Sequence, residues 1–314
     1  MNCFKDCRLK YKYVYLDEIV MVGGPPADVA AKGTDLHEVM ELFDSAKTYE
    51  DLTEMFRKKR EGATYDVVKY DHMKALPRLW RFWCSEVKAR EEGGWKVKKE
   101  GWTEMDWSLF AKREFKTRMQ AVKMCGSVDL LLTSPERKKA DRKYIVIDYK
   151  TGGTASISED YKRQLMTYGL LVAEKYEIPY AEIADRISLA LFFPMAKIKD
   201  EESIDESVAE KEMLRNLKYL KYTKDDLDDL VREVNGVIAE TGTRDWSKID
   251  PIHDSELKYT CSWCPFNGSG PEQGEIPGFI GCPRTRERGY KTADGVKFVT
   301  KADAKVLEQM SVRK

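Results

Sequence analysis

Residues 126–133 have the sequence Gly-Ser-Val-Asp-Leu-Leu-Leu-Thr, and residues 143–152 have the sequence Lys-Tyr-Ile-Val-Ile-Asp-Tyr-Lys-Thr-Gly. Both are short apolar runs, and the charged turn 134–139 separates them, so they predict two neighbouring strands. Each run contains one aspartate, Asp129 in the first and Asp148 near the end of the second. A carboxylate in an apolar strand is costly to bury unless it is paired or binds a metal ion. The two strands therefore predict a site on a buried sheet.

Helical patterns flank these strands. Apolar residues recur at helical spacing after Thr34, and we expect further helices over 66–91, 157–175 and 223–240. In the last of these, Thr223 is the expected N-cap. Residues 187–193 predict another buried strand. We therefore expect an α/β fold with a central mixed sheet flanked by helices.

The composition is that of a soluble globular protein and excludes several classes. The 314 residues contain 54 basic and 54 acidic side chains, and 42% of them are hydrophobic. No apolar run approaches the roughly 20 residues that span a bilayer, so we expect no membrane association. An apolar signal segment is not visible near Met1, and a cytoplasmic location follows as an expectation, in the host cytoplasm if the source is viral. Phosphate-loop, nucleophile-elbow and H-E-x-x-H motifs are absent from the sequence.

Asp148 and Lys150 carry the predicted chemistry. They are two residues apart, so on a strand their side chains face the same side. Carboxylate oxygens converging from two strands suit Mg²⁺ or Mn²⁺. A lysine beside a metal-bound aspartate can position a water or stabilise charge on a phosphate under attack. By itself the D-x-K tripeptide carries little information, because edge or turn aspartates with a solvated lysine explain most such tripeptides.

Three further residues accompany this pair in a fixed order. His37 closes a G-x-x-x-H pattern that begins at Gly33. Gln164 and Tyr168 are four residues apart on the expected helix after Lys150, so they share one helix face. Each of these motifs also has an ordinary structural explanation as a polar residue on an amphipathic helix.

Taken in order, the patterns G-x-x-x-H, G-x-V-D, I-D-Y-K-T-G and Q-x-x-x-Y resemble the RecB-like branch of the PD-(D/E)XK nucleases. The resemblance implies a restriction-endonuclease-like core and Mg²⁺ or Mn²⁺ as cofactor. Carried over residue by residue, it implies three side-chain metal ligands and one backbone carbonyl, namely His37, Asp129, Asp148 and Tyr149. It also implies that Asp129 and Asp148 act in catalysis with Lys150, which Gln164 and Tyr168 support.

The cysteines suggest a second metal centre. Cys261 and Cys264 form a C-x-x-C pair, which can present two thiolates to one metal, and Cys282 follows. Cys7 precedes a basic and aromatic stretch that is similar to the opening of iron–sulfur members of this branch, which include the CRISPR-associated adaptation exonucleases and the AddB nuclease domain. By that resemblance, these four cysteines hold a 4Fe-4S cluster that joins the two chain ends.

Alternatives to this assignment remain open. The family usually places its last two cysteines close together, whereas residues 265–281 separate them here. A zinc ion in a Cys₄ site is the rival, and a site without metal is a third alternative. Cys3 is a substitute for Cys7, whereas Cys84 and Cys125 are expected to be small core residues.

The resulting prediction is a metal-dependent DNA exonuclease that acts on ends or single strands. Its nuclease core would span residues 1–250, and residues 251–314 would form a cysteine-rich lobe with a basic tail. The resemblance implies DNA as the substrate and a helicase, recombination or CRISPR-adaptation protein as the kind of partner. Stand-alone chains of this kind occur in CRISPR loci and in viruses or phages, and the sequence does not choose between these. Two other classes remain: a non-catalytic DNA-end or partner-binding module on the same fold, and a structural zinc-binding interaction protein.

Overall fold

The computed structural model describes residues 7–22, 37, 40, 46, 48–61, 75–117, 119, 121–196, 216–245, 266, 276, 297–300 and 302–303. The chain forms two compact units. One combines Met1–Pro26 with Arg232–Lys314, and the other is Ala27–Val231. The predicted boundary at residue 250 stays a prediction, because most residues beyond it lie outside the described part of the chain.

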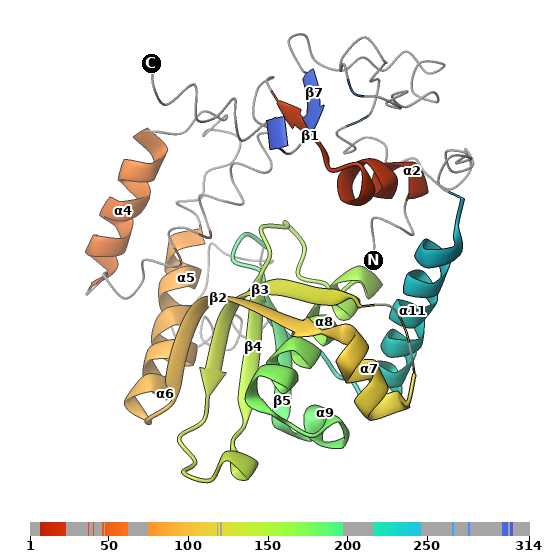
Figure 1. The fold of residues 1–314 in the computed structure, drawn as a ribbon. Coiled ribbons are helices and arrows are strands. Elements are labelled where there is room, and N and C mark those ends of the chain that lie inside the picture. The colour runs from red at the N-terminus through yellow and green to blue at the C-terminus, as the bar shows by residue number, and fades with distance from the viewer. Residues whose placement is uncertain are drawn as a thin grey trace. The chain divides into compact units, whose positions relative to one another are not determined.

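A five-stranded mixed sheet forms the centre of the larger unit (Figure 1). Its strands follow the order β2-β3-β4-β5-β6, and only β4 and β5 are parallel. The strands are β2 (Lys96–Asp106), β3 (Lys123–Thr133), β4 (Tyr144–Tyr149), β5 (Ile187–Phe192) and β6 (Leu217–Tyr219). The α/β class and the strands predicted around Asp129 and Asp148 and over 187–193 are confirmed.

The register of β3 and β4 brings the two predicted aspartates together. Leu130 pairs with Ile147 in this antiparallel ladder, so the next pair along the strands is Asp129 and Asp148. All six residues of β4 are buried, as expected for a strand in the middle of a sheet. The connection to the parallel strand β5 runs through helix α8 (Glu159–Tyr176), in the manner of a βαβ unit.

Helix α8 covers one face of this sheet and contacts strands β2 to β5. Ser158 caps it by accepting a hydrogen bond from the backbone N–H of Tyr161. The ring of Tyr144 packs on Tyr176 near the end of the helix, with ring centroids 4.9 Å apart. Because side chains alternate along a strand, Asp148 points to the same face as Tyr144 and therefore toward α8.

Gly126 on β3 lets α8 approach the sheet closely. A Cβ atom at this position would lie 2.9 Å from the Tyr168 ring and 3.3 Å from Leu171, which is closer than van der Waals contact allows. The glycine of the G-x-V-D motif is therefore a packing requirement of the helix that carries Gln164 and Tyr168.

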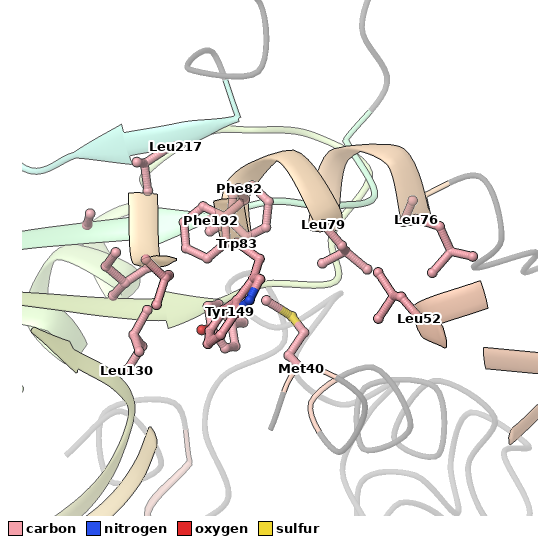
Figure 2. Packing of buried hydrophobic residues seen from close by; sticks show 14 of the residues in the cluster. Met40, Leu52, Leu76, Leu79, Phe82, Trp83, Leu130, Tyr149, Phe192 and Leu217 are labelled. Atoms are coloured by element: carbon pink, nitrogen blue, oxygen red, sulfur yellow. The ribbon is translucent and has the colours of Figure 1, made fainter. Parts of the chain in front are cut away.

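The opposite face of the sheet carries the main hydrophobic core (Figure 2). It is covered by α4 (Tyr49–Glu61), α5 (Leu76–Phe82) and the π-helical segment η4 (Trp83–Lys88), which continues into α6 (Ala89–Glu92). Phe82 stacks on Phe192 with ring centroids 4.0 Å apart, and Tyr149 packs edge-on against both rings. A helix predicted over 66–91 is confirmed from Leu76 onward, and residues 62–74 lie outside the described residues.

Other elements complete the larger unit. Helix α7 (Trp107–Phe115) follows β2 directly and is capped by Asp106, and η5 (Lys139–Asp141) lies between β3 and β4. The segments η6 (Tyr180–Glu182) and α9 (Ile183–Arg186) precede β5. Helix α11 (Lys224–Thr243) begins in the larger unit and belongs to the smaller one from Arg232 onward, and it confirms the helix predicted over 223–240. Thr223 and Asp226 exchange side-chain to backbone hydrogen bonds at its start, which is a capping box.

The smaller unit joins segments from both ends of the chain. It contains α2 (Arg8–Tyr11), the π-helical turn η1 (Lys12–Leu16) and β1 (Ile19–Val22), which pairs antiparallel with β7 (Lys297–Thr300). Phe266 is buried against Tyr13, with ring centroids 5.0 Å apart. Cys7 packs against this small cluster. Cys3, Cys261, Cys264 and Cys282 lie outside the described residues.

Candidate active site

Lys150 leaves strand β4 in a fixed position. Its backbone N–H donates to the Phe192 carbonyl at 2.9 Å, so the parallel β4–β5 ladder holds the start of the side chain. The ammonium Nζ lies 2.6 Å from Asp148 Oδ2 and donates to Gln164 Oε1 at 2.9 Å. Gln164 Nε2 in turn donates to the Tyr168 hydroxyl at 2.9 Å. A continuous chain of polar contacts thus runs from the β4 carboxylate to helix α8.

Asp129 lies on the other side of Asp148. Its Oδ2 accepts a hydrogen bond from the Tyr149 backbone N–H at 2.7 Å, which fixes the carboxylate across the two strand ends. Its Oδ1 lies 3.6 Å from His37 Nδ1. The His37 ring also meets the Tyr149 ring edge-on, with centroids 5.8 Å apart. The predicted helical position of His37 is confirmed for the described residues His37 and Met40.

Burial controls the charges at this site. Asp148 is 3% exposed, and burial together with the neighbouring Asp129 carboxylate raises its pKa to about 6, although Lys150 opposes the shift. The pKa of His37 is raised chiefly because its ring N–H donates toward the Asp129 carboxylate, which favours the protonated imidazole. Burial and the negative charge of Asp148 raise the pKa of the Tyr168 phenol to about 12, so it stays neutral. Two neighbouring carboxylates that are largely buried favour the binding of a cation, which offsets their negative charge.

The structure brings together all the residues that were predicted for the nuclease site. They form two sets of contacts, which the backbone of residues 148–150 joins. One set contains His37, Asp129 and Tyr149, and the other contains Asp148, Lys150, Gln164 and Tyr168. Cys84 is half-buried against the main core, and burial raises the pKa of its thiol. The expectation for Cys125 was wrong: it is exposed on β3, opposite Glu104, where the described part of the sheet leaves one face of the β2–β3 hairpin uncovered.

Sequence reasoning missed one residue that touches Lys150. The Tyr161 ring centroid lies 5.0 Å from Lys150 Nζ. A signal was present, because Tyr161 precedes Gln164 by three residues and Tyr168 by seven, which is the spacing of one helix face.

Aspartates on two adjacent strands of a mixed sheet, with a lysine directly after the end of one strand, define a nuclease-type site. The sequence comparison specifies the family: a model of the PD-(D/E)XK nuclease superfamily matches residues 1–269, and the chain belongs to that superfamily. A search of the curated proteins finds no match. Membership indicates a metal-dependent nuclease with DNA as substrate and Mg²⁺ or Mn²⁺ as its usual ion. None of the described helices is long and apolar enough to cross a membrane.

The residue types at the site fit such an ion. Two carboxylates, one imidazole and the Tyr149 carbonyl form an oxygen-rich donor set. Asp148 Oδ2 is buried and makes no well-aligned hydrogen bond, although Lys150 lies beside it. Within the described ranges no three His, Cys, Asp or Glu side chains surround a common point. Lys150 Nζ lies 2.6 Å from Asp148 Oδ2, and His37 Nδ1 lies 3.6 Å from Asp129 Oδ1.

Proposed function

We propose that this protein is a metal-dependent DNA exonuclease of the RecB-like branch, acting on DNA ends or single strands. The observation that carries the proposal is the contact chain from Asp148 through Lys150 and Gln164 to Tyr168, with Asp129 beside it. This chain of contacts places a lysine ammonium against a buried carboxylate. There the ammonium could bind the phosphate and position the attacking water.

His37, Asp129, Asp148 and the Tyr149 carbonyl are the proposed ligands of Mg²⁺ or Mn²⁺. A bound divalent ion would supply an activated water and positive charge for the phosphate oxygens. His37 Nδ1 lies 3.6 Å from Asp129 Oδ1, and Lys150 Nζ lies 2.6 Å from Asp148 Oδ2, so the proposed ligands lie beside the lysine. From this position Lys150 would orient the attacking water and stabilise the charge that develops on the phosphate.

Gln164 and Tyr168 have supporting roles in this proposal. The amide oxygen of Gln164 accepts from Lys150 and its NH₂ group donates to the Tyr168 hydroxyl, so the orientation of the amide is fixed. The Tyr168 hydroxyl keeps its proton, because its pKa is raised to about 12. It can therefore donate a hydrogen bond to a phosphate of the DNA backbone.

We further propose that Cys7, Cys261, Cys264 and Cys282 hold a 4Fe-4S cluster, with zinc in the same ligands as the rival. The supporting observation is in the smaller unit: Cys7 packs against the cluster formed by Leu9, Tyr13, Ile19 and Phe266, and Phe266 follows Cys264 by two residues. Iron and sulfide analysis, zinc analysis and the absorbance of anaerobically purified protein distinguish the two metals. Cys261→Ser should remove the metal, whereas Cys84→Ser should leave the metal content unchanged.

The nuclease assay uses end-labelled single- and double-stranded DNA with Mg²⁺ or Mn²⁺. Wild-type protein is compared with Lys150→Ala and with Lys143→Ala as the matched control, because Lys143 is an exposed lysine at the start of β4. We expect degradation by the wild type and by the control, and none by Lys150→Ala. The position of the label gives the polarity of digestion. DNA binding without degradation by correctly folded wild-type protein would contradict the proposal and favour a non-catalytic module.

A further inference from the structure

The Tyr161 ring forms a wall beside the Lys150 ammonium. Its centroid lies 5.0 Å from Lys150 Nζ, within the range of a cation–π contact. Tyr161 is in the first turn of α8, and Gln164 follows on the next turn of the same helix face. One helix face therefore presents both an aromatic ring and an amide oxygen to a single lysine.

Lys150 is nearly enclosed by these groups. Its side chain is 16% exposed, although a free lysine ammonium is strongly hydrated. Asp148 Oδ2 and Gln164 Oε1 approach two of its sides, at 2.6 Å and 2.9 Å. The Tyr161 ring also lies beside the ammonium, with its centroid 5.0 Å from Nζ.

The position of the Tyr161 ring is itself fixed. The Ser158 side chain accepts a hydrogen bond from the Tyr161 backbone N–H at 3.2 Å, which anchors the first helical turn. The ring also packs against Phe193, which is 1% exposed and directly follows β5, with centroids 6.3 Å apart. Helix capping and core packing therefore place the ring before any DNA is bound.

We propose that Tyr161 is a positioning residue for Lys150, holding its ammonium against Asp148 and Gln164 through the face of the ring. The inference deepens the proposed nuclease function and depends on it for its effect on catalysis. The contact joins the aromatic ring to the ammonium. A phenylalanine at position 161 should therefore preserve the function of the tyrosine, whereas an aliphatic side chain should not. The effect is expected on turnover, because the ring acts through Lys150.

The experiment compares Tyr161→Phe, Tyr161→Leu and Tyr161→Met with the wild type in the nuclease assay. The matched control is Tyr176→Leu, since Tyr176 is on the same helix and its recorded ring contact is with Tyr144 in the core. For Tyr161→Leu and Tyr161→Met we expect kcat to fall about 3- to 30-fold with KM within about twofold of wild type. Tyr161→Phe should stay within about threefold of wild-type kcat, and Tyr176→Leu should show no loss of kcat.

A second readout follows Lys150 directly. Brief acetylation with acetic anhydride, followed by mass spectrometry of the Lys150 peptide, measures how accessible the ammonium is. We expect several-fold faster labelling in Tyr161→Leu than in Tyr161→Phe, with an unchanged rate at the exposed Lys143 as the internal standard. Thermal unfolding of each variant identifies any that fail to fold.

The outcomes separate this inference from the proposed function. An inactive wild type contradicts the nuclease proposal, and the labelling comparison still tests the enclosure of Lys150. An active wild type with unchanged kcat in folded Tyr161→Leu and Tyr161→Met overturns the inference alone. Equal losses in the phenylalanine and leucine variants also overturn it, because they would assign the effect to the hydroxyl group.

Discussion

Replacing Asp148 with asparagine should make the metal-free protein more stable, and increasingly so as the pH rises. Burial and the Asp129 carboxylate raise the pKa of Asp148 from 3.8 to about 6 in the folded chain. A carboxyl whose pKa is raised by folding contributes its full stability below its unfolded pKa and loses it as the pH rises through the folded value. At pH 8 the ionised Asp148 therefore costs about 3 kcal/mol, since the shift is about two units and each unit corresponds to about 1.36 kcal/mol.

The pH dependence of the gain is the quantity to measure. The asparagine variant removes the ionisable group, so its advantage should grow by about 1.5 kcal/mol between pH 5 and pH 8, while most of the remainder develops below pH 5. Any constant effect of the amide on packing cancels in this difference. Urea unfolding of both proteins in EDTA at the two pH values gives the four free energies of unfolding.

Asp141→Asn provides the matched control, because Asp141 is an exposed aspartate on η5. Its effect on stability should be the same at pH 5 and pH 8. If Asp148→Asn behaved like this control, the carboxylate would not be held ionised at a cost, and the electrostatic argument for the site would be wrong. Addition of Mg²⁺ or Mn²⁺ at pH 8 should raise the unfolding midpoint of the wild type and have little effect on Asp148→Asn.

Two further variants test how α8 is held. Gly126→Ala places a methyl group 2.9 Å from the Tyr168 ring, so we expect a loss of about 1–3 kcal/mol in urea unfolding and a fall in nuclease turnover of at least about tenfold. A Cβ atom at Gly153 would have no atom within 4 Å, so Gly153→Ala should leave stability and turnover unchanged. Equal effects of the two alanine substitutions would refute the packing argument. Asp226→Ala removes the acceptor of the Thr223 backbone N–H in the capping box of α11 and also the partner of Lys162, with an expected cost of about 1 kcal/mol at pH 7. Because these partners lower the pKa of Asp226, that cost should disappear as the pH falls below about 4, and a constant cost across this range would contradict it.

The sequence predicted the elements whose own pattern is strong. Strands β3, β4 and β5 are apolar runs between turn signals, and α8 and α11 have helical periodicity with Ser158 and Thr223 at their starts. The order of the motifs predicted which residues belong together, and the register of β3 and β4 and the packing of α8 bring those residues close to one another. These predictions succeeded because local pattern and tertiary packing agree.

Strand β2 and helix α7 could not be predicted in the same way. The stretch from Lys96 to Asp106 is rich in lysine and contains Gly101, a composition that disfavours a central strand. Such a sequence is suited to the edge of a sheet, where β2 lies, and its pairing with β3 decides its structure. The burial of Cys125 was predicted wrongly for a related reason. Whether a side chain on the β2–β3 hairpin is buried depends on which face of the hairpin another element covers.

The site geometry was the least predictable part. No residue pattern indicates that His37 and Lys150 would each contact one aspartate, because this depends on distances between three segments: the one around His37, β3, and β4 with Lys150. The ring of Tyr161 beside Lys150 is a comparable case. Its helical spacing was visible, but a tyrosine at that spacing packs in a core more often than it faces a lysine.

The parallel pairing of β4 with β5 has a consequence for folding order. Strands β3 and β4 pair across a short connection, whereas β4 meets β5 only after α8 has folded back over the sheet. Contacts between distant parts of a chain form late, because closing the long loop costs entropy before the contact compensates for it. The Lys150 backbone bonds to Phe192, so the lysine acquires its final position only when β5 has been added. A chain still emerging from the ribosome would therefore contain both aspartates and the lysine before it had a competent site, and hydrolytic activity would arise only once the sheet was complete.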